Sequence, residues 1–99
     1  MKSQYQTDKL FIGGKWVEPA GKERFEIVSP TTEELLGYAP AASVEDINRA
    51  VAVARECFDN SDWPNLSFEE RAKLLYRAAD VFDANAARVA EVSADESGL

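Results

Sequence analysis

The 99-residue sequence contains no histidine and only one cysteine, Cys57. Without histidine there is no Ser-His-Asp triad, no Cys-His pair and no imidazole general base. One cysteine cannot form an internal disulfide, and without histidine it cannot supply the ligand set of a structural zinc site. These absences exclude several classes of enzyme and metalloprotein, but they identify no function.

Basic charge is also scarce, since 11 Lys and Arg face 18 Asp and Glu and the net charge is −7. The imbalance lies in the later part of the chain, because residues 1–32 carry a net charge of +1 and residues 33–99 carry −8. An acidic surface repels nucleic-acid phosphates and anionic lipid headgroups. We therefore expect neither nucleic acid nor a membrane as a partner.

Long apolar runs are absent as well. No run approaches the ~20 residues that span a bilayer, and the polar start Met1 to Asp8 lacks the apolar stretch of a secretory signal. Together with the lone unpaired cysteine, this pattern indicates a cytoplasmic protein. Residues 1–8 are predicted to be a flexible start and residues 9–99 to form one unit, and the 45% apolar content of the whole chain suffices for one small core.

Strand patterns dominate the first forty residues. Gly13-Gly14 is a two-residue turn signal between short apolar runs, so it predicts a β-hairpin. A second pair of strands is expected on either side of the turn residues Ser29 to Thr32. The four predicted strands are Lys9 to Ile12, Lys15 to Glu18, Arg24 to Val28 and Leu35 to Ala39.

Helical spacing begins at Ser43, which with Asp46 is a weaker form of the capping box and predicts a helix over 44–58. Ser67 and Glu70 form a full capping box before a broad apolar stripe that runs from Phe68 to Val89 and predicts a helix with a broad buried face. The fold class is therefore α+β, with short antiparallel hairpins followed by amphipathic helices.

Two or three such helices are expected, because Asn85 is in position to cap a further short helix over 86–95.

No group of residues forms a catalytic constellation. Cys57 lies near the end of a predicted helix, where the dipole disfavours a thiolate, so a structural or incidental role is expected. The adjacent acids at Glu33-Glu34, Glu69-Glu70 and Asp95-Glu96 point to different sides of their elements. Gly13-Gly14 lacks the G-x-G-x-x-G order of a dinucleotide loop. The residues themselves thus indicate no catalytic and no cofactor-binding group.

The order of segments, however, resembles the opening part of aldehyde dehydrogenases. The hairpin Leu10 to Trp16 is similar to that family's first hairpin, and Phe25 to Glu34 is similar to its next strand and Asn-Pro-x-Thr-Gly-Glu turn. Ser43 to Phe58 is similar to its first helix, and Trp63-Pro64 with Glu91 to Gly98 falls in the family's order and spacing. The resemblance covers nearly the whole chain, from residue 9 to residue 99.

Three positions depart from the family pattern. Ser29 stands where the family usually has Asn, Glu33 where it usually has Gly, and Leu99 where Lys commonly follows the glycine. These departures suggest a divergent member of the family.

The resemblance implies a larger α/β fold and an enzyme that oxidises an aldehyde to a carboxylic acid with NAD or NADP. In the family, the catalytic Cys, the Glu base and the cofactor-binding motifs lie further along a longer chain, and none maps onto these residues. Residues 9–99 would then be an amino-terminal segment associated with the cofactor-binding domain, truncated before the catalytic region. The expected partners are the remainder of the enzyme chain, the aldehyde substrate and, when complete, further copies in a homo-oligomer. On its own, this chain is expected to be inactive.

Some residues of one family site have matching positions in this segment. Many members hold a monovalent cation, Na or K, with backbone carbonyls before the Asn-Pro turn and a carboxylate near the end of the third helix. The matching positions are Ile27, Val28 and Glu96. Oxygen ligands suit a hard cation. The alternative is that Glu96 is a surface acid in the last helical turn.

A second reading of the whole chain is a stand-alone helical binding or assembly module without catalytic activity. The two hypotheses differ in the surface they require. A truncated segment exposes a large apolar patch where the rest of the enzyme docks, whereas a true module unfolds in one sharp transition and forms a defined oligomer.

Overall fold

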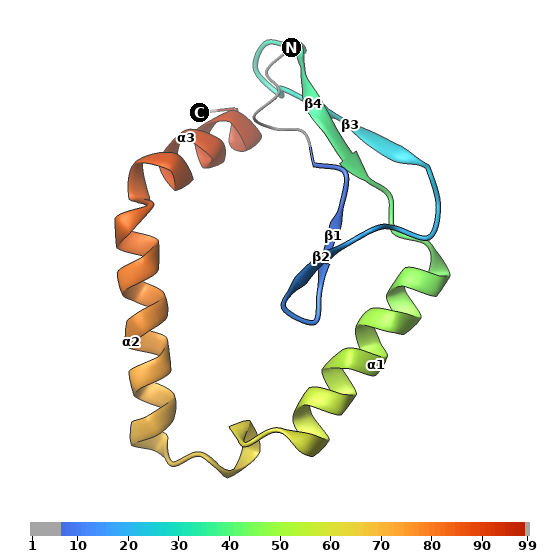
Figure 1. The fold of residues 1–99 in the computed structure, drawn as a ribbon. Helices are drawn as coiled ribbons and strands as arrows, with labels where there is room; N and C mark the ends of the chain where they lie inside the picture. The colour runs from blue at the N-terminus through green and yellow to red at the C-terminus, as the bar shows by residue number, and fades with distance from the viewer. Residues whose placement is uncertain (1–6, 99) are drawn as a thin grey trace.

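The computed structural model describes residues 7–98, which form two small antiparallel sheets, three α-helices and one 3-10 turn (Figure 1). The elements follow one another around a central opening, with α2 lying across that opening from α1 and the first hairpin. Thr7 and Asp8 of the predicted flexible start contact the second sheet through Tyr38 and Arg24, while residues 1–6 of that start lie outside the described residues.

The first sheet pairs β1 (Leu10–Ile12) with β2 (Lys15–Val17) in antiparallel register. Gly13 and Gly14 have φ angles of 65° and 77°, which are the two consecutive positive values that a type I′ turn requires. On the strands, the rings of Phe11 and Trp16 meet edge to face at 5.1 Å between centroids. The predicted hairpin is therefore confirmed.

The second sheet pairs β3 (Arg24–Val28) with β4 (Leu35–Pro40), and its register changes between Ile27 and Val28. Both predicted strands are confirmed, with β4 one residue longer than expected. In the connecting turn, the Oγ of Ser29 accepts hydrogen bonds from the amides of Thr31 (3.3 Å) and Thr32 (3.2 Å). Ser29 is 7% exposed. A serine hydroxyl thus organises this turn as an asparagine side chain would.

Glu33 closes the same turn in a left-handed conformation, with φ of 63°. It is the only described residue other than glycine with a positive φ. Its amide donates to the carbonyl oxygen of Ser29 (2.9 Å), which fixes the reversal of the chain. The backbone therefore explains why a glycine suits this position.

Three helices follow, α1 (Val44–Asn60), α2 (Phe68–Ala84) and α3 (Ala86–Ser97), with η2 (Trp63–Asn65) between the first two. The Ser67 capping box is confirmed, since Ser67 Oγ accepts from the Glu70 amide and Glu70 Oε1 accepts from the Ser67 amide. The Ser43 cap is stronger than predicted, because Asp46 completes a reciprocal box there. α1 also ends two residues later than expected.

Asn85 is the N-cap residue of α3, as predicted, but its side chain makes no capping hydrogen bond there. The Nδ2 of Asn85 donates instead to the carbonyl oxygen of Val81 (2.8 Å), so the side chain completes the end of α2. α3 still begins at residue 86, because the backbone carbonyl of Asn85 accepts from the amide of Val89 (3.0 Å). Gly98 ends α3 with φ of 75°, the usual left-handed C-terminal residue.

The prediction of a small self-contained core is also wrong for the described residues. No hydrophobic side chain among them is buried, and the two buried residues are Ser29 and Asp46. The α2 stripe predicted to be buried is open, with Phe68, Leu75 and Phe82 exposed by 87%, 67% and 62%. The reason is the open arrangement, since α2 packs mainly against α3 and the sheets do not cover its apolar face.

No helix in the described range is both long and apolar enough to cross a bilayer.

Candidate functional site

The residues expected to bind a cation lie in two segments whose neighbouring residues, Thr31 and Gly98, are hydrogen-bonded to each other. Ile27 and Val28 end β3, and Glu96 lies exposed in the last turn of α3. The Oγ1 of Thr31 donates to the carbonyl oxygen of Gly98 (2.7 Å), which joins the turn after β3 to the end of α3. The fold therefore brings the two halves of the expected site into the same region.

The ligand chemistry available there is that of backbone oxygens. The β3–β4 ladder is irregular between Ile27 and Val28, and such irregularities locally disrupt the pairing of the backbone groups. Among residues 7–98, no three His, Cys, Asp or Glu side chains cluster as metal ligands would. Carbonyl oxygens with one carboxylate suit a hard ion better than a transition metal.

The most polar buried centre is Asp46, which is 1% exposed. Its Oδ2 accepts from the amide (2.9 Å) and hydroxyl (3.0 Å) of Ser43, and its Oδ1 accepts from the amide of Ala20 (2.9 Å) and from Arg49 (3.2 Å). Arg49 also donates to the carbonyl oxygen of Glu18 (3.1 Å). This network fastens the chain after β2 to the first turn of α1.

The Asp46 carboxylate is held in its ionised form. The hydrogen bond from the Ser43 amide lowers the pKa of Asp46, and the Ala20 amide, the Ser43 hydroxyl and the Arg49 charge lower it further, against the opposing effect of burial. A carboxylate with a lowered pKa and four donors is an anchor and not a proton donor. The sequence showed its partner Ser43, three residues away, but gave no signal for Ala20, which is 26 residues away.

Cys57 is exposed near the end of α1 and lines a shallow groove between α1 and the first hairpin. The groove's other lining residues include Phe11, Gly13 and Val53, and none of its lining residues is a base. The Sγ of Cys57 lies 3.9 Å from the hydroxyl of Ser61. None of the described residues that line this groove activates the thiol as a nucleophile.

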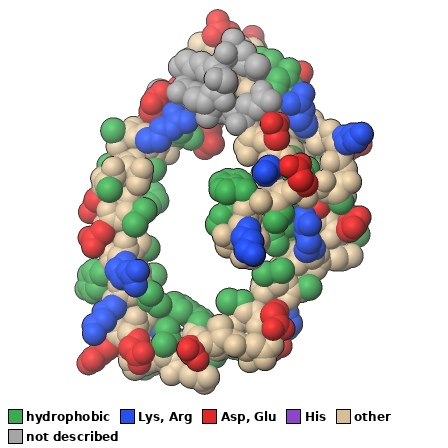
Figure 2. Space-filling view, viewed as in Figure 1, with side chains coloured by type: hydrophobic (Ala, Val, Ile, Leu, Met, Phe, Trp, Pro, Cys, Tyr) green, Lys and Arg blue, Asp and Glu red, His purple; other side chains and the backbone are tan. Residues whose placement is uncertain are grey.

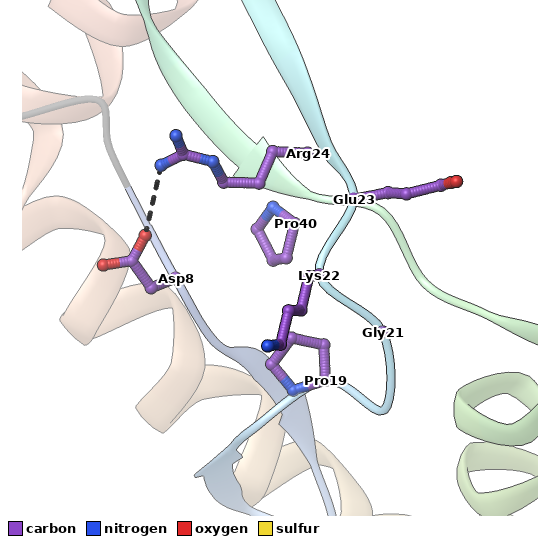
Figure 3. Close-up of a pocket in the computed structure, with 7 residues that line it drawn as sticks. All are labelled: Asp8, Pro19, Gly21, Lys22, Glu23, Arg24 and Pro40. Carbon is purple, nitrogen blue, oxygen red and sulfur yellow. Dashed lines mark ion pairs between the residues drawn. The ribbon is translucent and has the colours of Figure 1, made fainter.

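A second cavity lies between the chain after β2 and the start of β3 (Figure 3). Arg24 points toward Asp8, with 3.9 Å between Nη1 and Oδ1, and stacks over the ring of Tyr38 at 4.4 Å. Glu23 points away from the cavity, and the rings of Pro19 and Pro40 form part of its wall. The residues that line the cavity form no converging set of catalytic groups. The cavity lies where the two hairpins adjoin.

The largest surface feature is apolar. Figure 2 shows hydrophobic side chains along α2 and on the part of the molecule that projects into the central opening. The large exposed side chains lie on both strands of the first hairpin, on β3, at η2 and along α1 and α2, and include Trp16, Phe25, Val51, Phe68 and Phe82. A run of large exposed apolar side chains along one helix, as on α2, is typical of an interaction surface.

Comparison with known proteins assigns the chain to a class. The family profile described as "Aldehyde dehydrogenase family" matches residues 16–99, so the chain belongs to the aldehyde dehydrogenase family, a family of oxidoreductases. Aldehyde dehydrogenase 1 of Tanacetum cinerariifolium is 41% identical over 91% of this chain, and the mitochondrial benzaldehyde dehydrogenase of Antirrhinum majus is 39% identical over 94% of it.

Solved structures agree with the sequence relatives. The chain matches an aldehyde dehydrogenase of Mycobacterium tuberculosis, crystallised with NAD+, with a TM-score of 0.89 and 38% identity over 94% of this chain. It matches an NAD-dependent aldehyde dehydrogenase of Sinorhizobium meliloti with a TM-score of 0.83 and 35% identity. The chain spans 18% of the first curated relative and 19% of each of these structures. Its hairpins and helices are thus one part of a larger fold.

Proposed function

We propose that the chain is the amino-terminal segment of an NAD- or NADP-dependent aldehyde dehydrogenase that oxidises an aldehyde to a carboxylic acid. The observation that carries this proposal is the close match of almost the whole chain to about a fifth of such an enzyme. The NAD named for two of the matched structures supports a nicotinamide cofactor. The cofactor accepts the hydride, and the residues of this chain form part of the framework around the cofactor-binding domain.

The segment's part in that enzyme is structural. Residues 9–99 pack around the cofactor-binding domain, and the catalytic Cys and Glu come from outside them. The lack of any buried hydrophobic side chain among the described residues supports this role, because the segment gains its core only from the rest of the chain. The same observation disfavours a stand-alone module, which requires a core of its own. We further propose a cytoplasmic homo-oligomer for the complete enzyme.

The test uses two proteins. One is the 99-residue chain, and the other is the full-length polypeptide, meaning the longest reading frame that contains its codons. With NAD or NADP and a panel of aldehydes, the full-length polypeptide should produce reduced cofactor and the 99-residue chain should produce none above background. Turnover by the short chain, or an inactive full-length polypeptide, would show that the proposal is wrong.

We also propose that the carbonyls of Ile27 and Val28 and the carboxylate of Glu96 bind Na or K in the complete enzyme. The contact between Thr31 and Gly98 supports this, because it brings the two segments together. Thermal unfolding of the full-length polypeptide should be shifted upward by Na or K relative to a bulky organic cation at equal ionic strength. Glu96→Gln should abolish that shift, and the exposed Glu56→Gln on α1 should leave it unchanged. A shift that survives in Glu96→Gln would contradict the site.

A further inference from the structure

A hydrogen bond connects the turn after β3 with the end of α3. The hydroxyl of Thr31 donates to the carbonyl oxygen of Gly98 over 2.7 Å, across 67 positions of the sequence. The ring of Pro30 lies beside the same glycine, since a Cβ built at Gly98 would lie 3.0 Å from it. The end of α3 is therefore seated on the turn at Pro30 and Thr31.

On the β3 side, the turn holds Thr31 in a defined position. The Oγ of Ser29, a residue that is 7% exposed, accepts from the amides of Thr31 (3.3 Å) and Thr32 (3.2 Å). The carbonyl oxygen of Ser29 accepts from the amide of Glu33 (2.9 Å). These bonds give the segment the fixed path of a tight turn. Because Ser29 directly follows Val28, the position of Thr31 is tied to the end of β3, where the proposed carbonyl ligands lie.

On the α3 side, Gly98 is tied to the helical turn that carries Glu96. The amide of Gly98 donates to the carbonyl oxygen of Ala94 (2.9 Å), so the hydrogen bonding of the helix continues to the glycine. Glu96 lies between these two residues and is exposed. Within residues 7–98, its carboxylate forms no ion pair with Lys or Arg. No described basic side chain therefore competes with a cation for this carboxylate.

Each partner of the Thr31 to Gly98 hydrogen bond is thus held next to one half of the proposed cation site. We propose that this bond preorganises the site, which makes Thr31 a positioning residue for the binding of Na or K. The inference rests on the cation site proposed above. An ion that bridges two segments binds more weakly when it must also bring them together, and a bond already made between the segments reduces that cost.

The experiment measures the apparent dissociation constant of the ion for the full-length polypeptide. NaCl or KCl replaces tetramethylammonium chloride at constant ionic strength, and the rise of the unfolding midpoint with ion concentration yields the constant. Thr31→Val keeps the shape of the side chain but removes the hydroxyl donor. It should weaken ion binding about fivefold, because a hydrogen bond with a net value of about 1 kcal/mol changes the population of the joined segments by that factor. Thr31→Ala, which removes the hydroxyl and adds no methyl group, should weaken binding equally.

Two control variants separate positioning from a general loss of stability. Thr31→Ser keeps a hydroxyl and should bind the ion as the native sequence does. Thr32→Val removes the neighbouring hydroxyl, which accepts from the amide of Glu34 (3.3 Å) within the turn, and should leave the constant unchanged. If Thr31 were only structural, Thr31→Val would lower the unfolding midpoint by the same amount at every ion concentration and would not change the constant.

The possible results distinguish this inference from the proposals on which it rests. If the native sequence binds the ion and the constant is unchanged in Thr31→Val, the positioning role alone is overturned. An equal weakening in Thr32→Val, or no recovery in Thr31→Ser, overturns it as well. If neither NaCl nor KCl shifts the unfolding of the native sequence, the cation site and this inference fail together. Aldehyde oxidation is measured in a separate assay, so a failure of that proposal is recognised independently.

Discussion

The hydroxyl of Thr31 donates a hydrogen bond of 2.7 Å to the carbonyl oxygen of Gly98, so two residues 67 positions apart close the chain into a ring. A Cβ at Gly98 would lie 2.7 Å from that hydroxyl and 3.0 Å from the ring of Pro30. The φ of Gly98 is also positive, at 75°. Two independent features therefore exclude a side chain at this contact.

Gly98→Ala should destabilise the full-length polypeptide by about 2 kcal/mol or more, since it adds a clash to the cost of a left-handed conformation. Two control variants, measured by thermal unfolding, separate the cost of the clash from the cost of the left-handed conformation. Gly14→Ala meets no atom within 4 Å but has a φ of 77°, so it should cost about 1 kcal/mol. Gly21→Ala has neither feature and should be neutral or slightly stabilising. Any other order of the three variants would contradict this account.

Removing the helix caps should have graded effects. Ser67→Ala should lower the free energy of unfolding by about 1 kcal/mol, because the Glu70 amide loses its acceptor. Ser43→Ala should cost more, since the buried Asp46 carboxylate also loses the Ser43 hydroxyl as a donor. Urea unfolding of the full-length polypeptide measures both. Ser93→Ala, exposed on α3, is the matched control and should change stability little; a Ser67 effect no larger than this control would exclude the capping role.

The Asp46 network should make stability depend on pH in a defined direction. Because the folded protein lowers the pKa of Asp46, its contribution is present above the ordinary aspartate value of about 4 and is lost as the pH falls through the lower folded value. Asp46→Asn should therefore be less stable than the native sequence at pH 7, and the difference should shrink below about pH 4. Unfolding curves from pH 7 to pH 2 test this. Asp59→Asn, which removes an exposed partner of Arg55, should show no comparable trend.

Glu33→Gly should stabilise the turn between β3 and β4. The left-handed φ of Glu33 costs about 1 kcal/mol, and glycine removes this cost while adding entropy to the unfolded chain, so the net gain is up to about 1 kcal/mol. The neighbouring Glu34→Gly lacks a positive φ to relieve and should destabilise. The midpoints of thermal unfolding of the two variants test this prediction. If Glu33→Gly destabilises the protein, the backbone at Glu33 is not strained.

Local features of the fold were predictable because they depend on short stretches. Gly13-Gly14 set the first hairpin, Ser67 set the start of α2, and proline and glycine marked the breaks. The bond from Asp46 to Ala20 was not predictable, since it joins residues far apart and depends on the path of the backbone. Nor did the apolar stripe of α2 reveal that the described residues leave it exposed, because periodicity shows that a face is to be buried without showing what buries it.

For the proposed cation site, the resemblance supplied Ile27, Val28 and Glu96, whereas the structure supplied the hydrogen bond between Thr31 and Gly98 that joins their two segments. The turn at Ser29 shows the limit of a motif: serine departs from the usual asparagine, yet its hydroxyl accepts the amides that organise the turn. A departure in residue type therefore need not change the local backbone.

The ring closed by Thr31 and Gly98 also bears on the order of folding during synthesis. Thr31 is made 67 residues before its partner, a delay of about 3 to 13 s at typical rates of translation. Closing a loop of that length costs ~4 kcal/mol of chain entropy, which one hydrogen bond does not repay. The hydrogen bond between Thr31 and Gly98 therefore does not hold the ring closed by itself, and we expect closure to depend on further contacts.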